Sequence, residues 1–304
     1  MNPALDLSTS TDRVVSEHKL RCETTRLDPG GGGINVSRVV HLLGGESLAI
    51  YAVGGLTGAA LRQMLDVEGV SSRAVPISGT TRQSFTVDES GTGRQFRFVL
   101  QGPELSEPEW RACLAAVRQT APHAGYLVAS GSLPPGVPED FYARVARLTR
   151  DSGARCVLDA SGVPLREALA EGVYLVKPSR RELGELVGAA LDTEQSQVTA
   201  ASDLIAAGSA ELVALTRGAK GAVLASAAGT VRLSVPTIQV LSTVGAGDSF
   251  LGAFVLRLSE GGDTDAAFRY AVAAGSATAQ TPATDLCRPE DVDALEATLP
   301  PIRR

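Results

Sequence analysis

A glycine turn followed by a carboxylate is the stretch of this sequence best suited to chemistry. Residues 242–249 have the sequence STVGAGDS, and an apolar run with helical spacing follows them. Glycine lets the backbone approach an anion, so the N–H groups of Gly245, Ala246 and Gly247 could form an oxyanion nest at the start of a helix. Asp248 at the edge of the nest could accept a proton from a hydroxyl group. The alternative is that Asp248 only caps the helix.

A second glycine-rich turn, within residues 28–45, also precedes a helical pattern. Four successive glycines are followed by Asn35 in the first helical turn. A merely flexible loop needs no asparagine there, whereas backbone N–H groups close to a polyhydroxy ligand do need glycine. Lys19, Arg21 and Arg82 are each more often solvated surface charges. Together, in an acidic protein, they suggest a clamp for a phosphate group.

Composition narrows the possible partners. The chain has 304 residues, 44% of them hydrophobic, and a net charge of −6. Such a charge argues against nucleic acid or an anionic membrane surface as the main partner. The four cysteines form no C-x-x-C pair, which is typical of reduced thiols in a cytoplasmic protein. The three histidines have no metal-binding spacing, and no apolar run is long enough to span a bilayer.

Short apolar runs alternate with stretches of helical periodicity along the chain. Five of these runs are predicted to be buried strands: residues 47–53, 126–130, 155–160, 173–178 and 212–216. The alternation predicts one α/β domain over residues 1–304, with a mostly parallel sheet covered by helices on both faces. Polar, glycine-containing segments follow several of the strands, at the edge where ligands bind to such sheets.

Two regions depart from this alternation. Residues 82–101 contain two segments of period-2 alternation joined by a turn at 89–93, which predicts a β-hairpin. The region around 13–29 also lacks helical periodicity. We interpret both as insertions that form a small β-lid; the alternative is a sheet edge without a role in the site.

Seven motifs then occur in a fixed order: NPALD (2–6), GGGGIN (30–35), GGLTG (54–58), SGSLPPG (130–136), KPSRREL (177–183), TRGAKGAV (216–223) and STVGAGDS (242–249). In this order they resemble the PfkB branch of the ribokinase-like sugar kinases, from end to end of the chain. The resemblance implies a three-layer α/β/α sandwich with a β-lid. The PfkB-type 6-phosphofructokinases are most similar, because tagatose-6-phosphate and 1-phosphofructokinases typically have lysine where this chain has Gly32.

The resemblance also implies roles for individual residues. The sugar hydroxyls would be held by Asp6, Gly30, Gly31 and Asn35, and its existing phosphate by Lys19, Arg21, Arg82 and Ser132. The ATP site would be formed by Lys177, Ser179, Glu182, Thr216, Gly218, Gly221 and Thr243. Glu182 would also hold Mg²⁺ through water. Asp248 would be the catalytic base, and the nest at 245–247 would stabilise the transferring phosphoryl group.

Three departures from the family pattern leave questions open. Ser179 replaces the asparagine of the N-x-x-E motif, which bears on Mg²⁺ affinity. Thr281, Ala283 and Asp285 replace the N-x-G-x-R pattern of a potassium site, so potassium dependence stays open. Relatives also have an apolar strand before the NPALD motif, and we expect such a strand to precede Asn2, with Met1 an internal methionine. The alternative is a genuine short form in which another segment fills the place of that strand.

These features together predict ATP- and Mg²⁺-dependent phosphorylation of a phosphorylated ketohexose, fructose 6-phosphate being the expected substrate. A kinase acting on tagatose 6-phosphate, fructose 1-phosphate or a nucleoside is one alternative. A non-catalytic sensor of sugar phosphates or nucleotides is another. The lid also predicts a homodimer, because an isolated hairpin is marginally stable and Phe85, Phe96 and Phe98 give it an apolar face.

Overall fold

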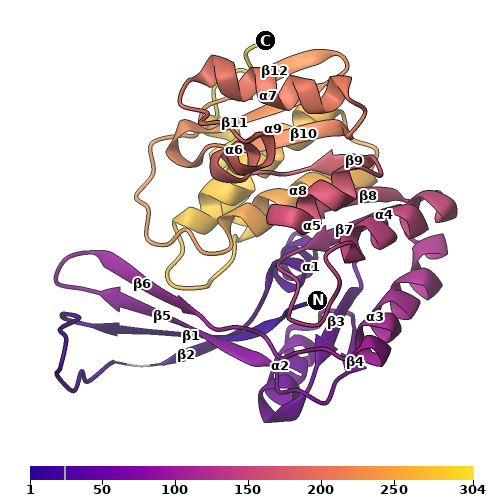
Figure 1. The fold of residues 1–304 in the computed structure, drawn as a ribbon. Helices are drawn as coiled ribbons and strands as arrows, with labels where there is room; N and C mark the ends of the chain where they lie inside the picture. The colour runs from indigo at the N-terminus through magenta and orange to yellow at the C-terminus, as the bar shows by residue number, and fades with distance from the viewer. Residues whose placement is uncertain (24) are drawn as a thin grey trace.

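The computed structural model describes residues 1–23 and 25–304, and it is an α/β structure built on a six-stranded sheet (Figure 1). The strand order is β12-β11-β10-β9-β8-β7. The strands are β7 (Tyr126–Ser130), β8 (Arg155–Asp159), β9 (Val173–Val176), β10 (Ala210–Thr216), β11 (Ala222–Ser226) and β12 (Gly229–Leu233). From β7 to β10 neighbouring strands are parallel, and β11 and β12 add an antiparallel edge.

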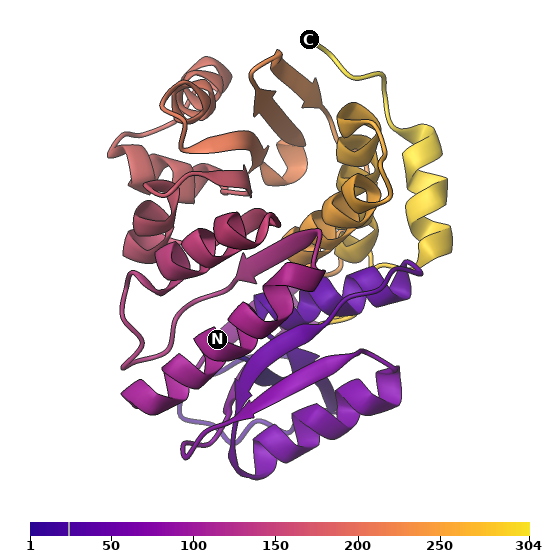
Figure 2. The same ribbon diagram turned by 90° about the vertical axis from the view of Figure 1, so that its right-hand side faces the viewer.

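Helices cover both faces of this sheet, as Figure 2 shows from the side. One core contains residues of α3 (Glu107–Thr120), α4 (Phe141–Ser152), α5 (Gly162–Leu169), α6 (Arg180–Val187) and α7 (Glu194–Ala206). The other contains residues of α1 (Gly32–Leu42), α8 (Ala246–Ser259), α9 (Thr264–Ala279) and α10 (Pro289–Thr298). Along β10, Val213 and Leu215 belong to the first core and Leu212 and Ala214 to the second. This alternation confirms a three-layer α/β/α sandwich.

A smaller unit adjoins the main sheet. Strands β3 (Ala49–Val53) and β4 (Ser72–Pro76) form a parallel pair of their own, connected by α2 (Gly55–Glu68). Leu61 and Leu65 of α2 pack on Tyr51 in a separate small core. The five predicted strands are all present, and each begins and ends within two residues of the observed strand.

The predicted lid is a four-stranded sheet that projects from the body of the molecule (Figure 1). Its strands are β1 (Ala4–Thr11), β2 (Arg26–Gly30), β5 (Arg82–Glu89) and β6 (Arg94–Val99), in the order β2-β1-β5-β6. The hairpin predicted within 82–101 is confirmed. Strand β1, which precedes the expected insertion at 13–29, is a central strand of the lid, whereas the described residues 12–23 form no strand. Thr24, inside that insertion, lies outside the described residues.

The two faces of the lid differ in chemistry. Leu7 of β1 is in register with Leu27 and Phe85, and Phe85 with Phe98, so an apolar row crosses all four strands on one face. Asp6, one residue earlier, belongs to the opposite face because side chains alternate along a strand. The lid thus bears Asp6 on one face and the apolar row on the other.

Within the residues described, no helix has the length and apolar character needed to cross a membrane. The four cysteines are free thiols, with Cys22 exposed and the other three buried.

Candidate active site

The nest lies at the start of α8, and Asp248 belongs to the helix itself. Gly245 is the N-cap and has a left-handed conformation, with φ of 76°. Asp248 is the third residue of the helix, so the interpretation that it serves as the N-cap is wrong. Its Oδ2 atom accepts a hydrogen bond of 2.8 Å from Nδ2 of Asn35, in the first turns of α1. Two helix N-termini therefore meet at this carboxylate.

The electrostatic surroundings of Asp248 make it a group that titrates near neutrality. Burial and, to a smaller extent, the negative charges of Asp159 and Asp6 raise its pKa to about 7, against the opposing effects of the hydrogen bond from Asn35 and the charge of Lys177. A general base works best when its pKa is close to the operating pH. Asp248 is thus electrostatically suited to accept a proton from a hydroxyl group.

Glycines bring the lid and α1 close to this carboxylate. A Cβ atom at Gly30 would collide with the carboxylate of Asp6, and one at Gly32 would collide with Oγ of Ser130 and lie 3.4 Å from Oδ1 of Asp248. Gly31, the N-cap of α1, has φ of 106°, which side chains rarely permit. Burial also raises the pKa of Asp6, to about 6, with Arg82 and Arg97 opposing the rise. The glycine turn is thus required by close packing.

A buried ion pair lies beneath the nest. Nζ of Lys177, just after β9, is 3.0 Å from Oδ1 of Asp159, at the end of the neighbouring strand β8. A Cβ atom at Gly247 would lie 3.3 Å from the same Nζ. The sequence analysis included Lys177 but missed Asp159. Its position at the carboxyl end of a predicted strand was the available signal, since ligands bind at that edge.

Ser179 and Glu182 together cap the start of α6. The sequence analysis had noted only that Ser179 replaces the asparagine of the family motif. Ser179 is the N-cap of α6, where its Oγ accepts from the N–H of Glu182 (3.3 Å), and the Oε2 of Glu182 accepts from the N–H of Ser179 (2.7 Å). This reciprocal pair is a capping box, whose S-x-x-E signature was already visible in the sequence. Serine in place of asparagine therefore fixes the start of the helix and the orientation of Glu182.

The donor set suits a magnesium ion that is only partly held by protein. Mg²⁺ is usually bound by one or two carboxylates, several waters and substrate phosphates. Asp159 and Glu182 are close enough that Glu182 contributes to raising the pKa of Asp159, after the larger effect of burial. Among residues 1–23 and 25–304, no group of three or more His, Cys, Asp or Glu side chains could hold a metal ion by itself. The residues present fit an ion shared with a nucleotide.

The remaining nucleotide-site candidates follow the same sheet edge. Thr216 ends β10, and its N–H donates to the carbonyl of Pro178 (3.0 Å) beside Ser179. Gly218 and Gly221 bound a short 3₁₀ turn with φ of 57° and 85°, and a Cβ at Gly221 would collide with the backbone of Leu233. Thr243 is exposed, two residues before the nest. Thr216 thus lies beside the segment that carries Lys177 and Ser179, while Gly218 and Gly221 form the turn that follows β10.

The candidate phosphate clamp is only partly assembled within one chain. Arg82 donates to the carbonyls of Leu100 (2.9 Å) and Asn2 (3.1 Å), and Asn2 donates to Oγ of Ser132 (3.1 Å). Arg82 and Ser132 thus converge at the base of the lid. Arg97 was missed by the sequence analysis, although it lies on the same face as Asp6 and lowers its pKa against the larger effect of burial.

Lys19 and Arg21 lie elsewhere, exposed in the connection at the far end of β1. The carbonyl of Arg21 accepts from the hydroxyl of Thr11 (3.4 Å), whereas Arg82 is in register with Ala4. Seven residues of strand separate these positions, which is about 23 Å at the usual rise per residue. The structure therefore does not bring Lys19 and Arg21 to Arg82 of the same chain.

Comparison with known proteins agrees with this geometry. The ATP-dependent 6-phosphofructokinase isozyme 2 of Mycobacterium tuberculosis is 47% identical over 293 residues, covering 96% of this chain and 86% of that protein. A crystal structure of phosphofructokinase-2 from Escherichia coli in complex with potassium has a TM-score of 0.94 at 38% identity, covering 98% of this chain and 96% of that one. The tetrameric inhibited form of the E. coli protein has a TM-score of 0.92 at 37% identity, with coverage of 98% and 96%.

A family-wide comparison extends this similarity over nearly the whole chain. Residues 2–291 match the family described as pfkB family carbohydrate kinase. That span includes both glycine turns, the lid strands and the nest before Asp248. The chain belongs to the pfkB family of carbohydrate kinases.

Proposed function

We propose that this kinase transfers the γ-phosphoryl group of ATP to the 1-hydroxyl group of fructose 6-phosphate. The observation that carries the proposal is the carboxylate of Asp248, held by Asn35 at the edge of an anion nest, with a pKa near 7. It adjoins the lid face that bears Asp6 and Arg82. The 6-phosphofructokinase names of the M. tuberculosis and E. coli relatives support the same substrate.

In the proposed reaction, Asp248 accepts the proton of the sugar hydroxyl as its oxygen attacks the phosphorus atom. Asn35 donates to Oδ2 and so leaves Oδ1 free for that proton. The N–H groups at 245–247 and the charge of Lys177 stabilise the negative charge that spreads over the transferring group. Mg²⁺, when bound near Asp159 and Glu182, would neutralise further charge on the phosphates.

The lid would supply recognition of the sugar. Asp6 is positioned to accept hydrogen bonds from sugar hydroxyls, and Arg82 to bind the 6-phosphate through its guanidinium group. Gly32 supports fructose 6-phosphate over fructose 1-phosphate or tagatose 6-phosphate as substrate. A lysine there, as in the kinases of those sugars, would have to find room between Ser130 and Asp248.

A second copy of the chain would complete the site. The outward row of Leu7, Phe85 and Phe98 is suited to pack against another lid, and Phe98 is 52% exposed. In such a homodimer, the exposed Lys19 and Arg21 at the tip of one lid would reach the sugar phosphate of the other subunit. The tetrameric form of the E. coli relative supports association of this kind.

The substrate is tested by steady-state turnover with a panel of sugars. Fructose 6-phosphate should give the highest kcat/KM, ahead of fructose 1-phosphate, tagatose 6-phosphate, ribose and a nucleoside. A preference for another member of the panel would reject the substrate. Absence of turnover with every member, despite nucleotide binding, would instead favour a sensor of sugar phosphates.

A further inference from the structure

The segment between α9 and α10 contacts both the lid and the body of the molecule. Within it, residues 281–285 include the three that replace the N-x-G-x-R pattern: Thr281, Ala283 and Asp285. Ala283 has φ of 55°, a left-handed conformation that residues with a Cβ atom rarely adopt. Such a conformation persists where surrounding contacts fix it, and it is most frequent at functional sites. The contacts of residues 281–285 therefore bear on function.

On the lid side, two neighbouring residues of the segment are bonded to β2. The hydroxyl of Thr284 donates to Oδ2 of Asp28 (2.6 Å), and both side chains are buried. The guanidinium of Arg26 pairs with the carboxylate of Asp285 and also donates to Asp28, at 2.8–3.0 Å. An arginine at position 285, as in the family pattern, would instead bring two like charges together. The contact thus depends on a residue by which this chain departs from that pattern.

These lid residues lie on the face that bears Asp6. Asp28 is in register with Asp6, and Arg26 with Ser8, so all four side chains belong to one face of the sheet. Oγ of Ser8 also lies 3.4 Å from Oγ1 of Thr284. Thr284 and its neighbour therefore hold the face of the lid to which the proposed function assigns the sugar.

On the body side, Ser242 connects the segment to the nest. Its buried hydroxyl donates to the carbonyl of Ala283 (2.6 Å) and accepts from the N–H of Val244 (3.2 Å), the residue just before the nest. Nε2 of Gln95, in β6 of the lid, lies 3.4 Å from the same hydroxyl oxygen. One buried hydroxyl thus connects the lid, the segment at 281–285 and the start of the nest.

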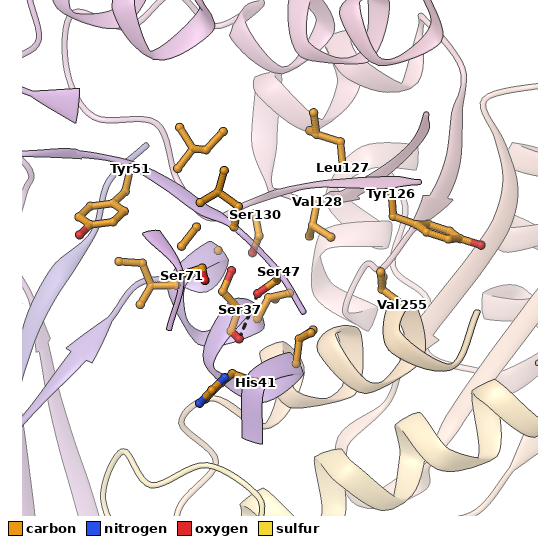
Figure 3. Close-up of a pocket in the computed structure, with 18 of the residues that line it drawn as sticks. Ser37, His41, Ser47, Tyr51, Ser71, Tyr126, Leu127, Val128, Ser130 and Val255 are labelled. Atoms are coloured by element: carbon orange, nitrogen blue, oxygen red, sulfur yellow. Dashed lines mark hydrogen bonds between the residues drawn. The ribbon is translucent and has the colours of Figure 1, made fainter. Parts of the chain in front are cut away.

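Helix α1 holds the other end of β2. Arg38 donates to the carbonyl of Pro29 (2.9 Å) and to the carboxylate of Glu68 in α2 (2.6 and 2.8 Å). By contrast, Ser37 and His41 of the same helix line a cavity of about 1030 Å³, which Figure 3 shows. Helix α1 therefore anchors the last residues of β2, and the segment after α9 anchors the first ones.

We propose that Thr284 and Asp285 are positioning residues for phosphoryl transfer, which couple the placement of the lid to that of the nest at 245–247. The inference rests on the proposed function, in which the lid holds the sugar and the nest holds the transferring group. Two reacting groups must be closely aligned, and a small misplacement of either lowers the rate strongly. The bonds from Thr284 to Asp28 and from Ser242 to Ala283 supply that alignment.

Amide hydrogen exchange in the absence of ligands tests the coupling from the lid side. The N–H of Val244 is bonded to the hydroxyl of Ser242, so its exchange reports on the start of the nest. Arg26→Gln removes the ion pair with Asp285 and should speed exchange at Val244 by about tenfold. Arg94→Gln is the matched control, because Arg94 is an exposed arginine in β6 of the same lid. It should leave exchange at Val244 unchanged.

Two substitutions of Thr284 test the coupling from the body side. Thr284→Val keeps the shape of the side chain without its hydroxyl, whereas Thr284→Ser keeps the hydroxyl. The valine variant should speed exchange at Val244 and lower kcat, each by about tenfold, and the serine variant should restore both. The decline of kcat/KM should stay near pH 7 in both variants, because Asp248 keeps its surroundings.

The proposal is overturned if Arg26→Gln matches Arg94→Gln in exchange at Val244, or if Thr284→Ser behaves like Thr284→Val. It is also overturned if exchange at the buried Val213 of β10 rises by the same factor, because the whole fold would then have lost stability. Faster exchange at Val244 with unchanged kcat would reject the positioning role. The exchange measurements need no substrate, so they separate a failure of the coupling from a failure of the proposed substrate, which the sugar panel reveals.

Discussion

The 2.8 Å hydrogen bond from Nδ2 of Asn35 to Oδ2 of Asp248 joins two helices whose N-termini converge on one point. Asn35 belongs to α1, which follows the glycine turn beside Asp6, and Asp248 belongs to α8, which follows the nest. The bond orients the carboxylate and leaves its second oxygen available. One contact therefore connects the proposed sugar side of the site to its proposed phosphoryl side.

Replacing Asp248 with asparagine tests its role as the base. The amide keeps the size of the side chain but cannot accept a proton, so kcat should fall by about 10² to 10⁴, the usual contribution of a general base. Nucleotide binding, followed by calorimetry, should stay close to that of the unmodified protein. Near-normal turnover in Asp248→Asn would reject the assignment.

The pH dependence of activity should follow the same carboxylate. Because burial raises the pKa of Asp248 to about 7, the group is protonated and inactive as a base at lower pH. The value of kcat/KM should therefore decline as pH falls through about 7, rather than near 4, where an exposed aspartate titrates. A pH profile that stays flat down to pH 5 would contradict this expectation.

The contribution of Asp248 to the free energy of unfolding should change with pH in the direction opposite to activity. Between the ordinary aspartate pKa of about 3.9 and the raised value, the folded state holds a proton that the unfolded state has released. The contribution of Asp248 to stability is thus present below that range and is lost as pH rises through about 7. Urea unfolding at pH 4.5 and pH 8 should show Asp248→Asn gaining stability, relative to the unmodified protein, at the higher pH.

Arg82→Ala should mainly raise KM for the sugar phosphate. The guanidinium would bind the phosphate equally in the ground state and the transition state, so its loss weakens binding more than it slows turnover. Arg118→Ala, on the exposed surface of α3, is the matched control and should leave KM unchanged. An unmodified enzyme that prefers fructose or ribose to their phosphates would reject the clamp itself.

Much of the central sheet could be predicted from the sequence because its strands are buried on both faces. Residues 126–130, for example, form a short continuous apolar run, and β7 has the same bounds. Strand β1 was not assigned to the lid, although Leu5 and Leu7 alternate with Asp6 and Ser8 in the period of a half-buried strand. Its partners are distant in sequence, and local periodicity does not identify them.

The candidate site was predicted less completely than the sheet, because several of its contacts join residues that are far apart in the sequence. The glycine turns and Asp248 are local patterns, whereas the pairing of Lys177 with Asp159 depends on which strands are neighbours. Lys19, Arg21 and Arg82 were grouped because all three belong to the lid. The length of β1 keeps the first two away from the third, and no short-range pattern reports that length.

The buried pair of Lys177 and Asp159 gives a prediction about stability. Lys177→Met would leave a buried carboxylate without its partner, which typically costs about 3–5 kcal/mol. Replacing both residues, in Lys177→Met with Asp159→Leu, should recover a large part of that loss, since no unpaired charge remains. Urea unfolding of the two variants checks this, and a double variant less stable than the single one would contradict it.

The last prediction concerns the aromatic face of the lid. Phe98→Asp places a charge in the row formed with Phe85 and Leu7, so it should convert the proposed dimer to a monomer in light scattering. Val99→Asp is the matched control: Val99 is the next residue, is 62% exposed, and lies on the opposite face of the same strand. It should leave the dimer intact, because only the face opposite Asp6 is proposed to pack.

If both variants stay dimeric, or the unmodified chain is a monomer with substrates present, subunits do not associate through this face. Where Phe98→Asp does dissociate the dimer, KM for the sugar phosphate should rise as well, because Lys19 and Arg21 of the second subunit would be lost with it.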